Sequence, residues 1–263
     1  MIRLIMIGFF LSLTLSTADS ADFKNNVVPL DQGETEVTFN ELLLQAEGGD
    51  SDAQSNLGVM YQEGVVIPQD YDEALKWYNL AAQNGSLEAS YNLSLLYMSG
   101  EGVLQDNKKA MKWTSLAAEQ GFSPAQFNLG MMYYTGQLFD QDTAKAVLWL
   151  ERAAEQGDRR GLFNLGIISQ ADKDYDRAFK WYKLASEEGE ILAQVNLAGL
   201  YALGKGTPKD LSRAHMWWTI AASQGRENAK FNKAFIEKKM SFSQIVMAQK
   251  LTTECIAKNY KGC

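Results

Sequence analysis

The chain has 263 residues, with 25 Lys and Arg against 32 Asp and Glu, one His and two Cys. An apolar share of 46% and a charged share of 22% exclude disorder of the whole chain. A net charge of −7 argues against nucleic-acid binding, because a phosphate-binding surface needs an excess of cations. One His and two Cys cannot form a zinc site without carboxylates, and we predict neither a metal site nor a cofactor.

Residues 1–20 have the pattern of a secretory signal peptide. Arg3 is followed by an apolar run of twelve residues, Leu4 to Leu15, which is short for a membrane span and fits a signal-peptide core. Small residues come next, and cleavage is expected after Ala18 or after Ser20. The alternative is an uncleaved N-terminal anchor. No later stretch reaches eighteen apolar residues, so we expect a periplasmic or secreted protein without stable membrane insertion.

Residues 21–38 show neither helical nor strand periodicity, and we predict a flexible leader there. From Phe39 onward, columns of identical residues recur every 36 residues, with a single interval of 32. The glycine column consists of Gly49, Gly85, Gly121, Gly157, Gly189 and Gly225, and the asparagine column of Asn56, Asn92, Asn128, Asn164, Asn196 and Asn232. Columns of Ala and Trp share the spacing, which is the signature of a repeat protein.

Each repeat is predicted to form two helices. In the first repeat, Gly64 is expected to end the first helix and Asp70 to cap the second. The two buried stripes are Ala53, Leu57, Gly58 and Tyr61 in the first helix and Ala74, Trp77, Tyr78 and Ala81 in the second. A single pair of such helices cannot cover its own apolar face. Stacked pairs can, and we therefore predict an all-α repeat architecture.

These residues resemble the Sel-one-like repeat, a relative of the tetratricopeptide repeat. The resemblance rests on the segments Gln54 to Gly58, Lys76 to Ala82 and Gly100 to Asp106. It implies a right-handed α/α solenoid of helix-turn-helix repeats and a role in binding. Five repeats are expected over residues 50–225, after an N-terminal half-repeat at residues 39–49. In the fourth repeat the loop between the helices is four residues short, so its first helix is expected to end early or to join its partner tightly.

Residues 226–263 are predicted to form a C-terminal half-repeat and a capping helix. Ser241 or Ser243 is expected to cap this last helix, which should run to about Lys258. Cys255 and Cys263 stand eight residues apart, and in an oxidising compartment we expect them to form a disulfide. The alternatives are a reactive thiol or a bridge between two chains.

No catalytic constellation is found in the sequence, and we predict that the protein is not an enzyme. Residues 199–206 nearly match a phosphate-binding loop, but they end a helix rather than a strand. His215 lies between a core Ala and a core Trp, and we expect a partly exposed structural histidine. Some cysteine-rich relatives have been connected with β-lactam chemistry, but this chain lacks their Cys pair in each repeat.

By resemblance to tetratricopeptide proteins, the first helices line the concave surface of the solenoid. The six residues of the asparagine column would point into that groove and bind an extended peptide backbone. Tyr91, Phe127 and Phe163 precede three of these asparagines and would supply apolar contacts there. The alternative is that the amides hydrogen-bond neighbouring helices.

Together these features favour an exported scaffold or adaptor that binds a protein or peptide partner in its concave groove. The alternatives are an envelope enzyme acting on β-lactams or the cell wall, and a scaffold for envelope polysaccharide assembly or regulation. The sequence does not identify the partner.

Overall fold

The computed structural model describes residues 32–64 and 67–263, and the side chains from residue 39 onward within these ranges. The predicted signal peptide lies outside them. The described chain forms thirteen helices and no strand. The helices are α2 (Gln32–Glu47), α3 (Ser51–Glu63), α4 (Tyr71–Gln83), α5 (Leu87–Ser99), α6 (Asn107–Glu119), α7 (Ser123–Thr135), α8 (Thr143–Glu155), α9 (Arg159–Ala171), α10 (Tyr175–Glu187), α11 (Ile191–Leu203), α12 (Leu211–Ser223), α13 (Glu227–Glu237) and α14 (Phe242–Ala257).

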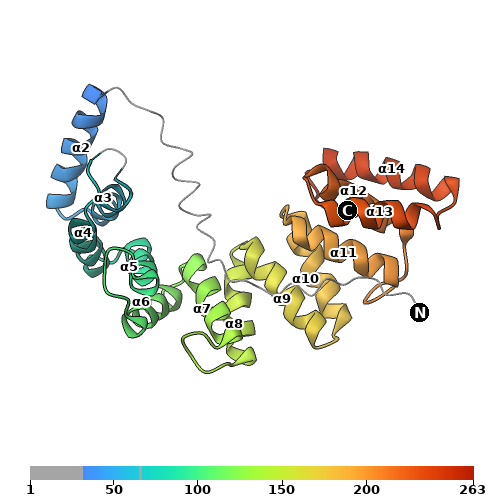
Figure 1. Cartoon of the computed structure of the whole chain (residues 1–263), viewed down its shortest axis with the longest axis horizontal. Helices are drawn as coiled ribbons and strands as arrows, with labels where there is room; N and C mark the ends of the chain where they lie inside the picture. The colour runs from blue at the N-terminus through green and yellow to red at the C-terminus, as the bar shows by residue number, and fades with distance from the viewer. Residues whose placement is uncertain (1–31, 65–66) are drawn as a thin grey trace.

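The helices follow one another along an arc, which confirms the predicted α-solenoid (Figure 1). Five pairs, from α3–α4 to α11–α12, form the repeats, and each second helix also packs against the first helix of the next repeat. First helices of consecutive repeats also contact each other, at α3–α5 and α9–α11. Because the inner side of an arc is shorter than its outer side, the first helices form the inner row.

The N-terminal helix α2 begins earlier than predicted. It starts at Gln32, inside the segment 21–38 that lacks periodicity and was expected to be a flexible leader throughout. Its C-terminal half packs against α3 through Phe39, Leu42, Leu43 and Ala46. Once this half is helical, adding further turns costs little, because nucleation rather than propagation is the unfavourable step. Helix therefore extends into a segment that has no apolar stripe of its own.

The ends of the helices are set by the residues that the repeat motif supplies. Asp70 accepts hydrogen bonds from the backbone N–H groups of Asp72 and Glu73, and Gly64 ends α3 in the left-handed conformation, as predicted. An Asp occupies the same N-cap position in all five second helices: Asp70, Asp106, Asp142, Asp174 and Asp210. The periodic sequence thus fixes where each helix starts.

Inside a repeat the two helices meet where a small residue faces a large one. A Cβ atom added at Gly58 would clash with the ring of Tyr78, and one added at Gly166 would lie 2.5 Å from the ring of Tyr182. Both rings are buried. These glycines therefore set the distance between the helices, because any larger side chain would push the ring away.

The fourth repeat joins its helices tightly, which is one of the two outcomes expected from its short loop. Helix α9 is 13 residues long, like the other first helices of the complete repeats, so it does not end early. Three residues, 172–174, connect it to α10, and Lys173 takes a left-handed conformation with φ of 62°. The deletion thus removes loop and leaves both helices whole.

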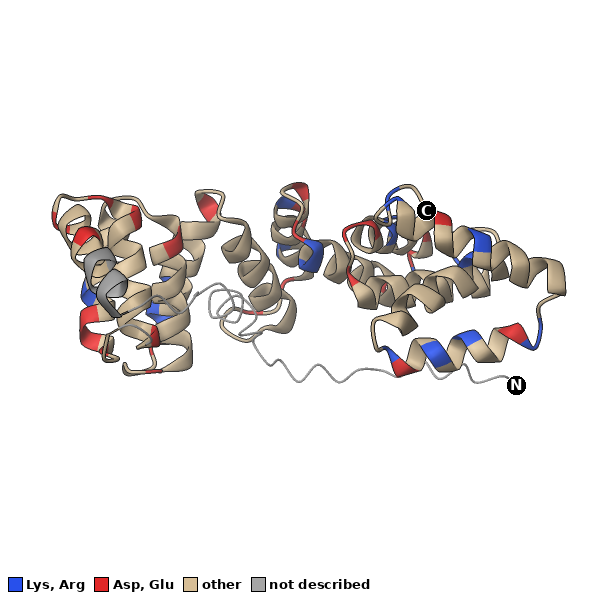
Figure 2. Ribbon diagram, turned by 90° about the horizontal axis from the view of Figure 1, so that it is seen from above, with Lys and Arg blue, Asp and Glu red and all other residues tan. Residues whose placement is uncertain are grey.

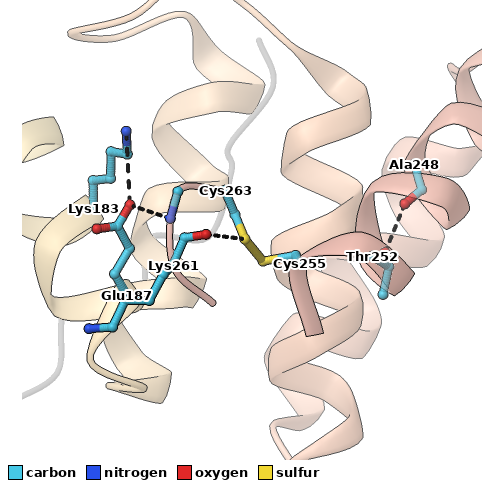
Figure 3. Close-up of a disulfide and its surroundings, with 8 residues drawn as sticks. Lys183, Glu187, Ala248, Thr252, Cys255, Lys261 and Cys263 are labelled. Atoms are coloured by element: carbon cyan, nitrogen blue, oxygen red, sulfur yellow. Dashed lines mark hydrogen bonds and ion pairs between the residues drawn. A yellow bond between two sulfur atoms is a disulfide. The ribbon is translucent and has the colours of Figure 1, made fainter. Parts of the chain in front are cut away.

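The C-terminal helix α14 packs against α12, where the Ser212 hydroxyl donates to the carbonyl oxygen of Gln244 at 3.2 Å. Ser241 caps it, as one of the two predicted candidates. The predicted disulfide between Cys255 and Cys263 is present, with 5.6 Å between the Cα atoms (Figure 3). Closing a loop of this size stabilises the fold by roughly 2–3 kcal/mol in the chain-entropy model. It holds the end of the chain against α10, where the backbone N–H of Gly262 donates to Glu187.

We expect Gly166→Ala to lower the free energy of unfolding by about 1–3 kcal/mol, because the new methyl group meets the buried ring of Tyr182. Gly199→Ala is the matched control, since a Cβ there meets no atom within 4 Å. It should raise stability by about 0.5–1 kcal/mol through higher helix propensity. Urea unfolding followed by circular dichroism measures both. Equal effects of the two changes would contradict the role given to Gly166.

Candidate functional site

The candidate site is the inner row of first helices, which carries the asparagine column. The structure places the six amides in different environments. Asn56 is exposed, Asn128 is buried with 9% of its surface accessible, and the other four are partly buried: Asn92, Asn164, Asn196 and Asn232. A row of equivalent positions in the sequence is therefore not a row of equally accessible amides.

Two of these amides donate hydrogen bonds within the fold. Asn128 Nδ2 donates to the Tyr91 hydroxyl at 2.9 Å and so links α7 to α5. Asn164 Nδ2 donates to the carbonyl oxygen of Arg160 at 2.8 Å, one turn earlier on α9. The first bond joins two repeats. The second stays on one helix and leaves the outer edge of the Asn164 side chain on the surface.

Two other amides lie next to buried tyrosines of the preceding repeat. Burial raises the pKa of Tyr78 and Tyr182 above the ordinary range of tyrosine. The side chain of Asn92 acts on the Tyr78 hydroxyl and that of Asn196 on the Tyr182 hydroxyl, in both cases lowering the pKa against this trend. The Tyr78 hydroxyl donates to Gln62 Oε1 at 2.8 Å within its own repeat, and the Tyr182 hydroxyl makes no hydrogen bond of good geometry within the described residues.

The predicted aromatic contacts are distributed unevenly along the same face. Tyr91 is buried, with 7% of its surface accessible, whereas Phe127 and Phe163 are half-buried. The guanidinium carbon of Arg160 lies 4.6 Å from the ring centroid of Phe127, and its Nη2 lies 2.7 Å from Asp158. The centre of the inner face, on α7 and α9, thus combines an aromatic ring, a cation and a carboxylate.

A small cavity of about 80 Å³ lies where the loop of the fourth repeat is shortened. It lies between α8, α9 and α10, and its lining residues are Val147, Leu165, Ile168, Ser169, Asp172, Asp174, Arg177 and Trp181. The sequence contains its signal, the four-residue deletion, but we predicted from it only a change in how the helices join. The cavity is a hollow between repeats rather than part of the inner face.

The single histidine differs from the prediction. His215 was expected to be partly exposed, but it is buried, with 2% of its surface accessible. Its Nε2 lies 2.7 Å from Glu237 Oε1, because α13 covers the α12 face on which it lies. No cluster of metal-ligating side chains occurs among the described residues. Nor is any helix within those ranges both long and apolar enough to cross a membrane.

The geometry defines an α-solenoid of paired helices whose inner face is a candidate binding surface. The sequence profile of the Sel1 repeat matches residues 51–86, 87–122, 123–158, 161–190 and 191–225. The chain therefore belongs to the Sel1 repeat family, as its motifs indicated. Proteins of this family are generally scaffolds for protein–protein interaction and typically not enzymes.

Solved structures similar to this chain include two Sel1 repeat (SLR) proteins. The first is c5321, described as a protective antigen present in uropathogenic Escherichia coli strains with an SLR fold. It is 30% identical, with a TM-score of 0.75 over 88% of this chain and 51% of that one, so the chain spans about half its length. The second is a Sel1 repeat protein from Oxalobacter formigenes, 29% identical, with a TM-score of 0.68 over 86% and 99% of the two chains. No protein among the curated proteins matches.

We expect Asn128→Ala to lower the free energy of unfolding by about 1–2 kcal/mol, because the buried Tyr91 hydroxyl loses its donor. Asn56→Ala, at the exposed position of the same column, should change it by less than about 0.5 kcal/mol. Combining Asn128→Ala with Tyr91→Phe in a double-mutant cycle should give a coupling of about 0.5–1.5 kcal/mol. Additive effects in the urea unfolding curves would show that the bond contributes nothing to stability.

Proposed function

We propose that this protein is an exported scaffold that binds a protein or peptide partner along the inner face of its solenoid. The observation that carries the proposal is the continuous row of first helices from α3 to α11, which presents one side of every repeat to the same space. An extended partner contacts several repeats at once on such a face, so many weak contacts add up. The general role of the family supports this assignment.

The centre of the row supplies the chemistry for such binding. The half-buried rings of Phe127 and Phe163 provide apolar surface, and the partly accessible side chain of Arg160, held by the buried side chain of Asp158, adds a positive charge. Asn164 bonds only along its own helix in the contacts described above, which leaves its amide oxygen to accept from a partner's backbone N–H. Contacts at the centre of an interface are also the best shielded from water, so truncation there costs most.

Two features support export. The N-terminal residues have the pattern of a signal peptide, although they lie outside the described residues. The Cys255–Cys263 disulfide is of the kind that persists in an oxidising compartment such as the bacterial periplasm or the exterior of the cell. The proposed location is therefore the periplasm or the medium.

The mature protein should begin at Asp19 or Ala21. N-terminal sequencing of the protein isolated from the envelope fraction and the medium of the producing cells measures this directly. A chain that begins at Met1 in both fractions would contradict cleavage of a signal peptide and favour the uncleaved anchor.

The variant Asn164→Arg tests the inner face. The larger charged side chain should weaken partner binding by about tenfold or more while the helix is kept, because Arg is a good helix former. Asn107→Arg places the same change at an exposed position on α6, a second helix, and is the control. Immobilised wild type and both variants are exposed to envelope extract, and captured proteins are quantified by mass spectrometry.

A partner of the inner face is retained by wild type and by the Asn107→Arg variant and lost by the Asn164→Arg variant, with equal circular dichroism for all three. If every captured protein binds the three forms equally, the inner face is not the binding surface.

A further inference from the structure

Among the described residues, α13 is a first helix that no second helix covers. In complete repeats, the residue before the column asparagine is buried or half-buried: Tyr91 and Val195 have 7% and 8% of their surface accessible, and Phe127 and Phe163 are half-buried. At the same position of α13, Phe231 is 67% accessible, and Phe235, one turn later, is 38% accessible. Tyr91 is covered by α6 and by the start of the next repeat, and α13 has no such neighbours. Two core phenylalanines thus lie on the surface.

The last helix does not take the missing place. α14 packs against α12 and runs back toward α10, where Lys261 pairs with Glu188. α13 is itself fixed on α12 by the contact of His215 with Glu237, and this hydrogen bond, together with Lys233, lowers the pKa of the Glu237 carboxyl. Ala229 and Ile236 face α12, so the opposite side of α13 is held outward.

At the other end of the described chain, α2 is a second helix without a first helix to pair with. By its place before Gly49, α2 corresponds to a second helix, and no first helix precedes it within the described residues. One side of α2 packs on α3. α2 also exposes Leu44, with 72% of its surface accessible, between the exposed carboxylates Glu41 and Glu47, at a position where the second helices of complete repeats have the less exposed Leu80 and Leu184, with 39% and 38% accessible.

The two ends also carry opposite charge. Residues 32–75 contain ten Asp and Glu and no Lys or Arg, whereas residues 226–263 contain eight Lys and Arg against three Asp and Glu. In Figure 2, Asp and Glu are frequent on the ribbon at the end of the solenoid that begins with α2, and Lys and Arg are frequent on the ribbon at the end that carries α13. Like ends therefore repel and unlike ends attract, which disfavours a symmetric contact between two copies through α13.

We propose that the protein self-associates head to tail, with α2 of one copy docking on the exposed side of α13 of another. Leu44 then covers the surface of Phe231 and Phe235, while Glu41 and Glu47 lie opposite Lys230 and Lys238. Such a contact joins two different surfaces, so it repeats from copy to copy and continues the solenoid across chains.

The contact is weaker than a junction inside the chain. Gln45 of α2 occupies the position at which the five complete second helices have a fully buried alanine: Ala81, Ala117, Ala153, Ala185 and Ala221. The larger polar side chain keeps α2 from approaching as closely. Association is therefore reversible, with a dissociation constant on the order of 10–100 µM, and it weakens with salt because its charges are exposed.

Sedimentation velocity on the exported protein, over a range of concentrations, tests this. At low salt the average mass should rise continuously with concentration, and about 0.5 M NaCl should reduce the rise. Phe231→Ala should raise the dissociation constant at least about tenfold. Leu104→Ala removes an even more exposed apolar side chain in the loop of the second repeat and should leave association unchanged. A chain that stays monomeric at low salt, or responds equally to the two changes, overturns the proposal.

A charge exchange identifies which surfaces meet. One variant carries Lys230→Glu and Lys238→Glu, and the other carries Glu41→Lys and Glu47→Lys. Each alone should be monomeric, because its altered end repels the unaltered end of its copies. A mixture should associate again, because both of its junctions then join opposite charges. A mixture that stays monomeric while wild type associates, or a symmetric dimer indifferent to both variants, overturns the head-to-tail arrangement.

Discussion

The structure depends on one constraint: the apolar face of each helix pair is covered only by the next pair. This constraint decides which contacts the repeated residues make. The ring of Tyr182 fills the space above Gly166 within its own repeat, and α11 of the following repeat packs against α10 from the other side. Stability is therefore shared between neighbours rather than stored in single repeats. A change at one glycine weakens its own pair and also the junction that rests on it.

The same constraint explains why one column of asparagines has several roles. At Asn128 the neighbouring first helix offers a tyrosine hydroxyl within reach, so the amide ties two repeats together. At Asn164 the equivalent neighbour is Phe127, which has no hydroxyl, and the amide turns to its own helix instead. What an asparagine does is thus decided by the residue one repeat earlier. The asparagines whose neighbour offers no hydroxyl are therefore the ones available to bind a partner along the inner face.

The periodic parts of the fold could be predicted from the sequence, because the motif itself fixes them. Asp70 and Gly64 mark helix ends through local hydrogen bonds and backbone conformation, and both lie where the motif places them. Contacts that break the period could not be predicted in the same way. The burial of His215 depends on Glu237, and the start of α2 depends on propagation from a packed half-helix. In the candidate site, the column was visible in the sequence, but the accessibility of each amide depends on non-local neighbours.

At the ends of the described solenoid, the neighbour that would bury a core residue is missing. If burial is supplied by the neighbour, a residue that keeps its core identity where the neighbour is missing is exposed for that reason alone. Phe231 and Tyr91 occupy the same column, yet only Tyr91 is covered. Natural repeat proteins usually give their terminal repeats a polar outer face, as Gln45 and Glu41 do in α2. α13 keeps two phenylalanines at the equivalent surface instead. The retained aromatic surface, flanked by lysines that the acidic end of the chain lacks, is the surface on which the proposed head-to-tail contact rests.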